Sequence, residues 1–90
     1  MNQDTLFTIE STIEFHFNNS NIRDNSYNSF IPEIQKLQTK RSKIIIEKKN
    51  MTNLLFKIES NDITAFRASI NEIISFGKII DSTISLTEIS

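Results

Sequence analysis

The sequence contains no cysteine, and this absence excludes disulfide bonds and thiolate metal sites. Its single histidine, His16, cannot assemble a metal site by itself. The chain also lacks a glycine-rich phosphate loop, a nucleophile with a nearby base, and a cluster of acids at metal-ligand spacing. We therefore expect a protein that is not an enzyme and that needs no cofactor.

Glycine and proline are scarce, with one residue of each among 90. No linker or internal repeat divides the chain, so we expect a single domain over residues 1–90 with its core at about 8–87. No stretch approaches the roughly 20 apolar residues that span a bilayer, and the first residues lack the pattern of a signal peptide. This predicts a soluble protein of the cytoplasm, and also of the nucleus if the source is a eukaryote.

Three segments have the pattern of β-strands. From Ile9 to Phe17 apolar and polar residues alternate strictly, which is typical of a strand with one solvent-exposed face. His16 falls on that polar face, where we expect a solvated surface residue. The segments 42–49 and 53–59 are rich in β-branched and apolar residues, and the short connection between them predicts a hairpin.

Two other segments have helical patterns. The first helix is expected to begin near Ser20 or Asn21, either of which can cap it, and to end at Pro32, because a proline disfavours helical backbone in the residue before it. The polar stretch from Pro32 to the hairpin is then a loop. The second helix begins behind Asp62, whose carboxylate can accept N–H groups of the first turn, and its apolar residues recur every three or four positions as far as Ile84.

Two apolar residues of this second helical pattern lie outside its main stripe. Ile79 and Leu86 are one heptad apart and fall roughly opposite Gly77, so a single sheet beneath the helix could not cover them. We interpret them as part of a second contact surface, available to a partner.

The order β-α-β-β-α has a simple geometric solution. A helical crossover makes the first and second strands parallel, and placing the third strand between them makes every pairing antiparallel. The sequence therefore predicts an α+β fold in which two helices cover one face of a three-stranded antiparallel sheet. The first or the second strand remains as an edge, through which dimerisation could extend the sheet.

Charge is distributed unevenly although the chain has a net charge of only -1. Between Lys36 and Lys57 there are seven basic residues and one acid, Glu47, so the rest of the chain is strongly acidic. A basic stretch of this kind can contact polyanions, although charges around a hairpin are more often simply solvated.

The most specific pattern lies in residues 54–74, LLFKIESNDITAFRASINEII. An acidic cap precedes a helix with the pattern D-x-x-A-h-R-A-S-h-N, in which h is apolar, and a proline follows the first helical segment. With the chain length and element order, this pattern resembles the small Pcc-type subunit of the KEOPS (EKC) complex, over roughly residues 8–86. The matching positions are Asp62, Ala65, Arg67, Ala68, Ser69 and Asn71.

The resemblance implies a non-catalytic dimerisation and scaffold subunit. Such subunits pair through their sheets, with an identical chain or a small paralogue, and bind the catalytic threonylcarbamoyltransferase subunit through their helices. The whole assembly installs threonylcarbamoyl on the tRNA adenosine next to the anticodon, and its ATP and metal sites lie on other subunits.

Candidate functional residues follow from the surplus apolar surface, the motif and the basic stretch. The candidates for partner contact are Tyr27, Ile31, Phe76, Ile79 and Leu86. In the family motif, Asp62, Arg67, Ser69 and Asn71 are the candidate positions, and Arg67 and Asn71 could hydrogen-bond each other, a partner or a phosphate. The candidates for nucleic-acid contact are Lys40, Arg41, Lys43, Lys48 and Lys49.

The main alternative is a free-standing RNA-binding module with a basic hairpin. Such a module usually carries stacking aromatic residues on its open sheet face or a glycine-containing phosphate loop. The polar faces of the predicted strands carry Thr, Glu, Lys and His instead. The sequence leaves open which strand would supply a pairing edge.

Overall fold

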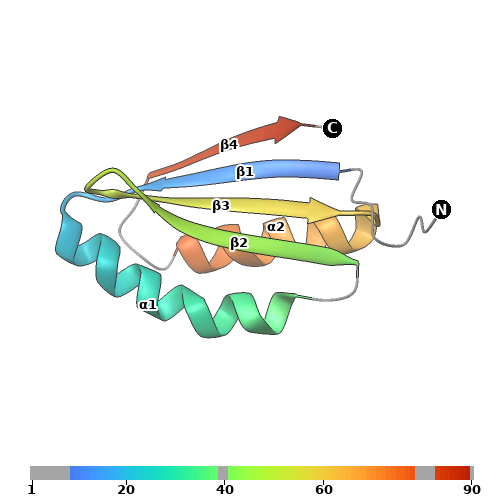
Figure 1. The fold of residues 1–90 in the computed structure, drawn as a ribbon, viewed down its shortest axis with the longest axis horizontal. Coiled ribbons are helices and arrows are strands. Elements are labelled where there is room, and N and C mark those ends of the chain that lie inside the picture. The colour runs from blue at the N-terminus through green and yellow to red at the C-terminus, as the bar shows by residue number, and fades with distance from the viewer. Residues whose placement is uncertain (1–8, 39–40, 79–82, 90) are drawn as a thin grey trace.

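The computed structural model of the chain describes residues 9–38, 41–78 and 83–89. Its elements are, in order, β1 (Ile9–His16), α1 (Ser20–Leu37), β2 (Ser42–Lys49), β3 (Asn53–Ser60), α2 (Ile63–Gly77) and β4 (Thr83–Ile89). The strands form one antiparallel sheet in the order β2-β3-β1-β4. Both helices cover the same face of this sheet (Figure 1).

Buried and partly exposed residues alternate along β1, so one face of the sheet points to the core and the other to solvent. Ser11, Ile13 and Phe15 of β1 are fully buried, whereas their sequence neighbours are partly exposed. The β2–β3 hairpin turns at Asn50, whose φ of 48° lies in the left-handed region that asparagine tolerates. Its side chain accepts a hydrogen bond of 3.1 Å from the N–H of Thr52, which stabilises the turn.

The core lies between the sheet and the helices and centres on aromatic rings. The ring of Phe30 from α1 contacts Phe15 of β1 and Phe56 of β3, with centroids 5.3 and 4.6 Å apart. Phe66 and Ile73 of α2 are buried in the same core, so the predicted apolar stripe is confirmed in its first half. These contacts fix both helices on one face.

The predicted order β-α-β-β-α, the hairpin and the central position of β3 are confirmed. The predicted end of the first helix is wrong, because α1 continues through Pro32 to Leu37. Burial of Ile34 explains the continuation, since it adds apolar contact that offsets the hydrogen bond lost at the proline. The cap is Asn19, one position before the predicted candidates, and it accepts the N–H of Ile22 at 2.9 Å.

The predicted extent of the second helix is also wrong, because α2 ends at Gly77 and residues 83–89 form β4. Glycine is a poor helix former, and the segment 83–87 alternates polar and apolar residues, a strand pattern that the helical interpretation overrode. Leu86 therefore lies on the sheet, opposite Ile13 of β1. Contrary to the prediction, Leu86 is thus not part of a second apolar surface on the helix, and Ile79 lies outside the described residues.

The fourth strand changes which strands form the edges of the sheet. β1 pairs with β3 on one side and with β4 on the other, so it is not an edge. β2 lies at one end of the strand order and β4 at the other. Of the two edges left open by the sequence, only β2 remains a candidate.

Candidate protein interface

A groove separates the two helices on the covered face of the sheet. The last turn of α1 supplies Leu37, the first half of α2 supplies Ala65 and Ala68, and Ser42 of β2 also lines the groove, whose volume is about 220 Å³. Because the helix residues here are small, another chain can approach the backbone of α2 closely. Where Phe76 of α2 meets Phe30 of α1, with ring centroids 4.6 Å apart, the helices contact each other and no groove is left.

The predicted partner-contact residues do not all lie in this groove. Phe76 is half-buried at the contact between the helices. Tyr27 and Ile31 are half-buried on the other flank of α1, beside β2, where the Lys48 ammonium lies 5.0 Å from the centre of the Tyr27 ring. Leu86 belongs to the sheet. The structure therefore distributes these residues over several surfaces.

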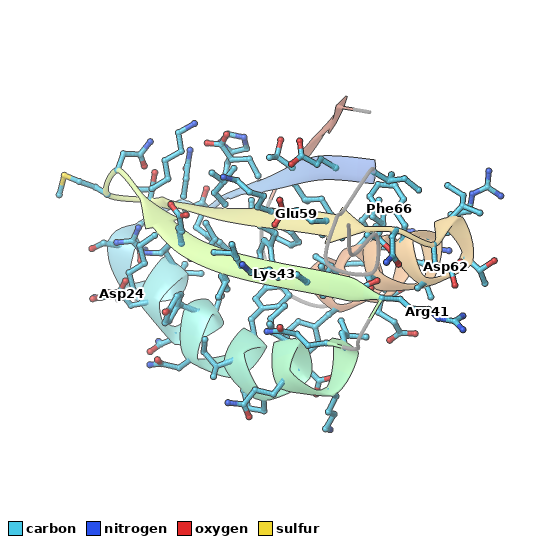
Figure 2. The ribbon with its side chains drawn as sticks, turned by 45° about the vertical axis from the view of Figure 1, so that its right-hand side comes forward. Asp24, Arg41, Lys43, Glu59, Asp62 and Phe66 are labelled. Carbon is cyan, nitrogen blue, oxygen red and sulfur yellow. The ribbon has the colours of Figure 1, made fainter. Side chains whose placement is uncertain are left out.

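The first residue of the family motif, Asp62, lies at a corner where β3, α2 and β2 meet. Its carboxylate accepts the N–H of Thr64 at 2.9 Å and pairs with the Arg41 guanidinium at 2.8 Å (Figure 2). The Thr64 N–H, and then Arg41, hold the pKa of this carboxyl below its usual range. Asp62 therefore caps α2 and fixes the chain before β2 to the same corner.

A buried serine pair holds this corner from beneath. Ser60 is fully buried, accepts the hydroxyl of Ser42 at 3.1 Å and the N–H of Asp62 at 3.1 Å, and donates to the carbonyl of Arg41 at 2.7 Å. The start of β2 and the start of α2 are thus linked through one hydroxyl. Ser42, which also lines the groove, is thereby joined to the start of α2.

The other motif residues lie on different sides of α2. Ser69 is buried and lines the groove toward α1. Arg67 and Asn71 are exposed on the opposite flank, where they line a hollow of about 470 Å³ together with Ile9 and Glu10 of β1. The apolar residues Ile63, Phe66 and Ile70 of α2 line the same hollow.

Most of the candidate nucleic-acid residues have acidic neighbours within the chain. Besides the Arg41 pair with Asp62, the Lys49 ammonium lies 3.2 Å from Glu14, and that of Lys48 lies 3.2 Å from Asp24. Lys43 is exposed on β2, opposite Glu59 in the β2–β3 register. Lys40 lies outside the described residues. The basic stretch is therefore largely neutralised by acids from other elements.

Arg23, which sequence reasoning missed, connects α1 to the hairpin. It is buried, and its guanidinium donates to the carbonyls of Asn50 and Asn53 at 3.1 Å each and to the Asp24 carboxylate at 2.7 Å. A signal for it exists in the sequence, because positions 23, 26, 30 and 34 follow helical spacing and place Arg23 on the buried stripe. This arginine orients the β2–β3 turn against α1.

Comparison of the sequence with protein families identifies one match over residues 10–85, to the family described as transcription factor Pcc1. The chain belongs to the Pcc1 family. This is a family of small KEOPS subunits, so the resemblance drawn from the motif is confirmed and the chain is a component of a multi-subunit complex. No curated protein matches the chain in sequence.

Solved structures with a similar fold extend the description of this Pcc1-family member. A de novo designed protein, Foldit4, matches with a TM-score of 0.73 and 12% identity, over 91% of this chain and 96% of the other. A designed ferredoxin-fold protein, LFR1 1, matches with a TM-score of 0.65 and 14% identity, over 94% of this chain and 87% of the other. A dimeric ferredoxin-like protein from an uncultured marine organism matches with a TM-score of 0.60 and 10% identity, over 90% of this chain and 92% of the other. At these identities the matches show a ferredoxin-like fold alone.

The described part of this Pcc1-family chain offers no group of three metal-ligating side chains. In the same residues, no helix has the length and apolar character needed to cross a membrane. Three features stand out on the described surface: the groove between the helices, the hollow beside Arg67 and the free edge of β2.

Proposed function

We propose that this chain is a non-catalytic dimerisation and scaffold subunit of a KEOPS complex. In this role it supports threonylcarbamoylation of the tRNA adenosine next to the anticodon by binding the catalytic subunit. The observation that carries the proposal is the match to the Pcc1 family over residues 10–85. Contact with tRNA would then be made by the assembly, and ATP and metal chemistry would belong to its other subunits.

The groove between α1 and α2 supports the proposal because it suits a partner helix. Ala65 and Ala68 leave room for a second backbone, and Leu37 supplies apolar surface at the groove wall. An amphipathic helix lying in an apolar groove is a common mode of recognition between proteins. The catalytic subunit is the partner that the family membership implies.

The pairing of the basic residues favours a scaffold over a free-standing RNA-binding module. Binding to phosphates by such a module depends on lysine and arginine side chains that neutralise them. Here Arg41, Lys48 and Lys49 already have carboxylate partners within 3.2 Å. These cations therefore already take part in ion pairs that hold the hairpin and the corner at Asp62.

Two variants on different flanks of α2 test the proposed groove. Ala65→Glu places a charge at a half-buried position of the groove, and we expect it to weaken binding to the catalytic subunit about tenfold or more, because a carboxylate would lose water against apolar surface. Asn71→Glu adds the same charge on the exposed opposite flank and is expected to leave the affinity within about twofold. Isothermal titration calorimetry measures both.

Equal affinity of the two variants and the unmodified chain would show that the groove is not the contact surface. Loss of binding in Asn71→Glu alone would move the contact to the hollow lined by Arg67. Circular dichroism of each variant establishes beforehand that the fold is intact.

A further inference from the structure

The hollow on the outer flank of α2 has no role in the proposed function. It has a volume of about 470 Å³ and is lined by residues of α2 together with Ile9 and Glu10 of β1. Figure 1 shows the start of β1 and the start of α2 at the same end of the sheet. The hollow therefore lies where the chain enters the sheet.

The wall that α2 contributes to this hollow is apolar and incompletely covered. Ile63 is 49% exposed, and among the described residues only it and Met51 are large apolar side chains with such exposure. Phe66 and Ile70 line the same hollow and belong to the hydrophobic core. An apolar side chain placed against Ile63 would therefore extend the core outward and remove apolar surface from water.

Two polar residues of the family motif border the hollow. Arg67 and Asn71 are exposed, lie one helical turn apart and line it from α2. Arg67 forms no ion pair with Glu10 or with any other residue that the structure describes. Its positive charge is therefore available to an acidic group that approaches the hollow.

The chain itself supplies an occupant within reach of the hollow. Residues 1–8 precede Ile9 and lie outside the described residues. An extended chain spans at most about 3.3 to 3.6 Å per residue, so the Cα of Phe7 lies within about 7 Å of the Cα of Ile9, which lines the hollow. A tethered segment also binds at a high effective concentration, whereas a separate partner loses translational and rotational freedom.

The alternation of β1 indicates which side chain of this segment suits the hollow. Buried residues recur at every second position from Ser11 to Phe15, on the face of the sheet that the helices cover. Phe7 continues this alternation through Ile9, whereas its neighbour Leu6 does not. In an extended segment, the ring of Phe7 is therefore directed to the side of the sheet on which α2 lies.

We propose that residues 1–8 cover this hollow, with the ring of Phe7 against Ile63. The segment contains one acid, Asp4, and no basic residue, so its charge is complementary to that of the unpaired Arg67. Covered in this way, the hollow is closed to other molecules. A partner would have to displace the segment to reach Arg67.

Pairs of introduced cysteines test the contact directly, because the chain has no cysteine of its own. Phe7→Cys combined with Ile63→Cys is expected to form a disulfide within one chain under mild oxidation, measured by mass spectrometry and by the loss of thiols that react with a maleimide. Leu6→Cys with Ile63→Cys is the matched control and should oxidise at least about tenfold more slowly. Phe7→Cys with Met51→Cys, in the turn at the far end of the sheet, should stay reduced.

Thermal unfolding of variants without cysteine gives a second readout. Phe7→Ser removes the ring, and we expect the midpoint of unfolding to fall by about 4 °C or more, whereas Leu6→Ser should lower it by less than about 2 °C. Adding Ile63→Ser to Phe7→Ser is expected to lower the midpoint by less than the sum of the two single shifts, because the two side chains would bury each other. Scanning calorimetry measures all of these variants.

Equal oxidation of the Phe7 and Leu6 pairs, or no disulfide in either, would overturn the proposal. A disulfide that joins two chains would also overturn it, because residues 1–8 would then cover the hollow of another copy. Shifts of Phe7→Ser and Ile63→Ser that add fully would show that the two side chains do not touch. None of these measurements involves the catalytic subunit, so their outcome leaves the proposed function unaffected.

Discussion

At the scale of single residues, buried polar groups decide how the hairpin is held. Arg23 is 7% exposed and contributes both hydrogen bonds between α1 and the turn carbonyls of Asn50 and Asn53. Its charge is compensated by Asp24, which also pairs with Lys48 of β2. Burying an arginine is tolerated here because its Nε and Nη1 groups have acceptors and its charge has a carboxylate partner.

Removing this arginine is therefore expected to cost stability. Arg23→Ala should lower the free energy of unfolding by about 2 to 4 kcal/mol, because it leaves two carbonyls without their donor and a cavity beside α1. Arg41→Ala removes an arginine from an exposed ion pair and is expected to cost at most about 1 kcal/mol. Urea unfolding followed by circular dichroism measures both, and equal losses would contradict the role assigned to Arg23.

A second prediction concerns the acid sensitivity of the hairpin. The Asn53 amide donates to Glu14 at 2.7 Å and, with Lys49, holds the pKa of this carboxyl below its usual range. Because the folded state binds this proton more weakly than the unfolded state, the contribution is present above the ordinary pKa and is lost as the pH falls below it.

We expect Glu14→Gln to flatten the fall in unfolding free energy between about pH 5 and pH 2. The variant should be less stable than the unmodified chain near neutral pH, and the difference should shrink on acidification. Urea titrations at a series of pH values provide the measurement. Parallel pH curves for the two proteins would show that Glu14 does not contribute to acid sensitivity.

At the scale of elements, the sequence predicted which segments form helices and strands better than it predicted where each one ends. The strand alternation of Ile9–Phe17, the hairpin and the Asp62 cap depend on local patterns, and the structure contains all three. The end of α1 was missed because burial of Ile34 outweighs the local effect of Pro32. The end of α2 was missed because residues 83–87 alternate as a strand while Ile84 also continues the helical spacing, and only pairing with β1 decides between the two.

The proline inside α1 gives a prediction at this scale. Pro32 cannot donate the hydrogen bond that an interior helical residue makes, and its ring crowds the preceding turn. Pro32→Ala is therefore expected to raise the free energy of unfolding by about 1 to 3 kcal/mol. Thermal unfolding would detect the gain, and Ser29→Ala, on the exposed side of the same helix, serves as control. A loss of stability in Pro32→Ala would mean that the proline supports this backbone.

The candidate site was predictable only in part. The motif identified the family and placed Asp62 at the helix cap, because capping depends on residues close in sequence. The groove between the helices was not predictable, since it depends on how far α1 extends and on which small residues of α2 face it. The ion pairs of Arg41, Lys48 and Lys49 join residues 21 to 35 positions apart in the sequence, and no local pattern indicates them.

At the scale of the whole molecule, the groove, the hollow and the sheet edge lie on three different sides of the helices. The groove lies between the two helices, the hollow of Arg67 and Asn71 lies on the far flank of α2, and the β2 edge lies beside α1. A partner helix in the groove would therefore leave the hollow and the free edge of β2 available for other contacts.

The most direct test is size-exclusion chromatography with multi-angle light scattering, run on the purified chain with and without the catalytic subunit of its KEOPS complex. We expect the chain alone to elute with the mass of two copies, and the mixture to elute as one larger species that contains both proteins. Separate elution of the two proteins at micromolar concentration, with their masses unchanged by mixing, would contradict the scaffold function.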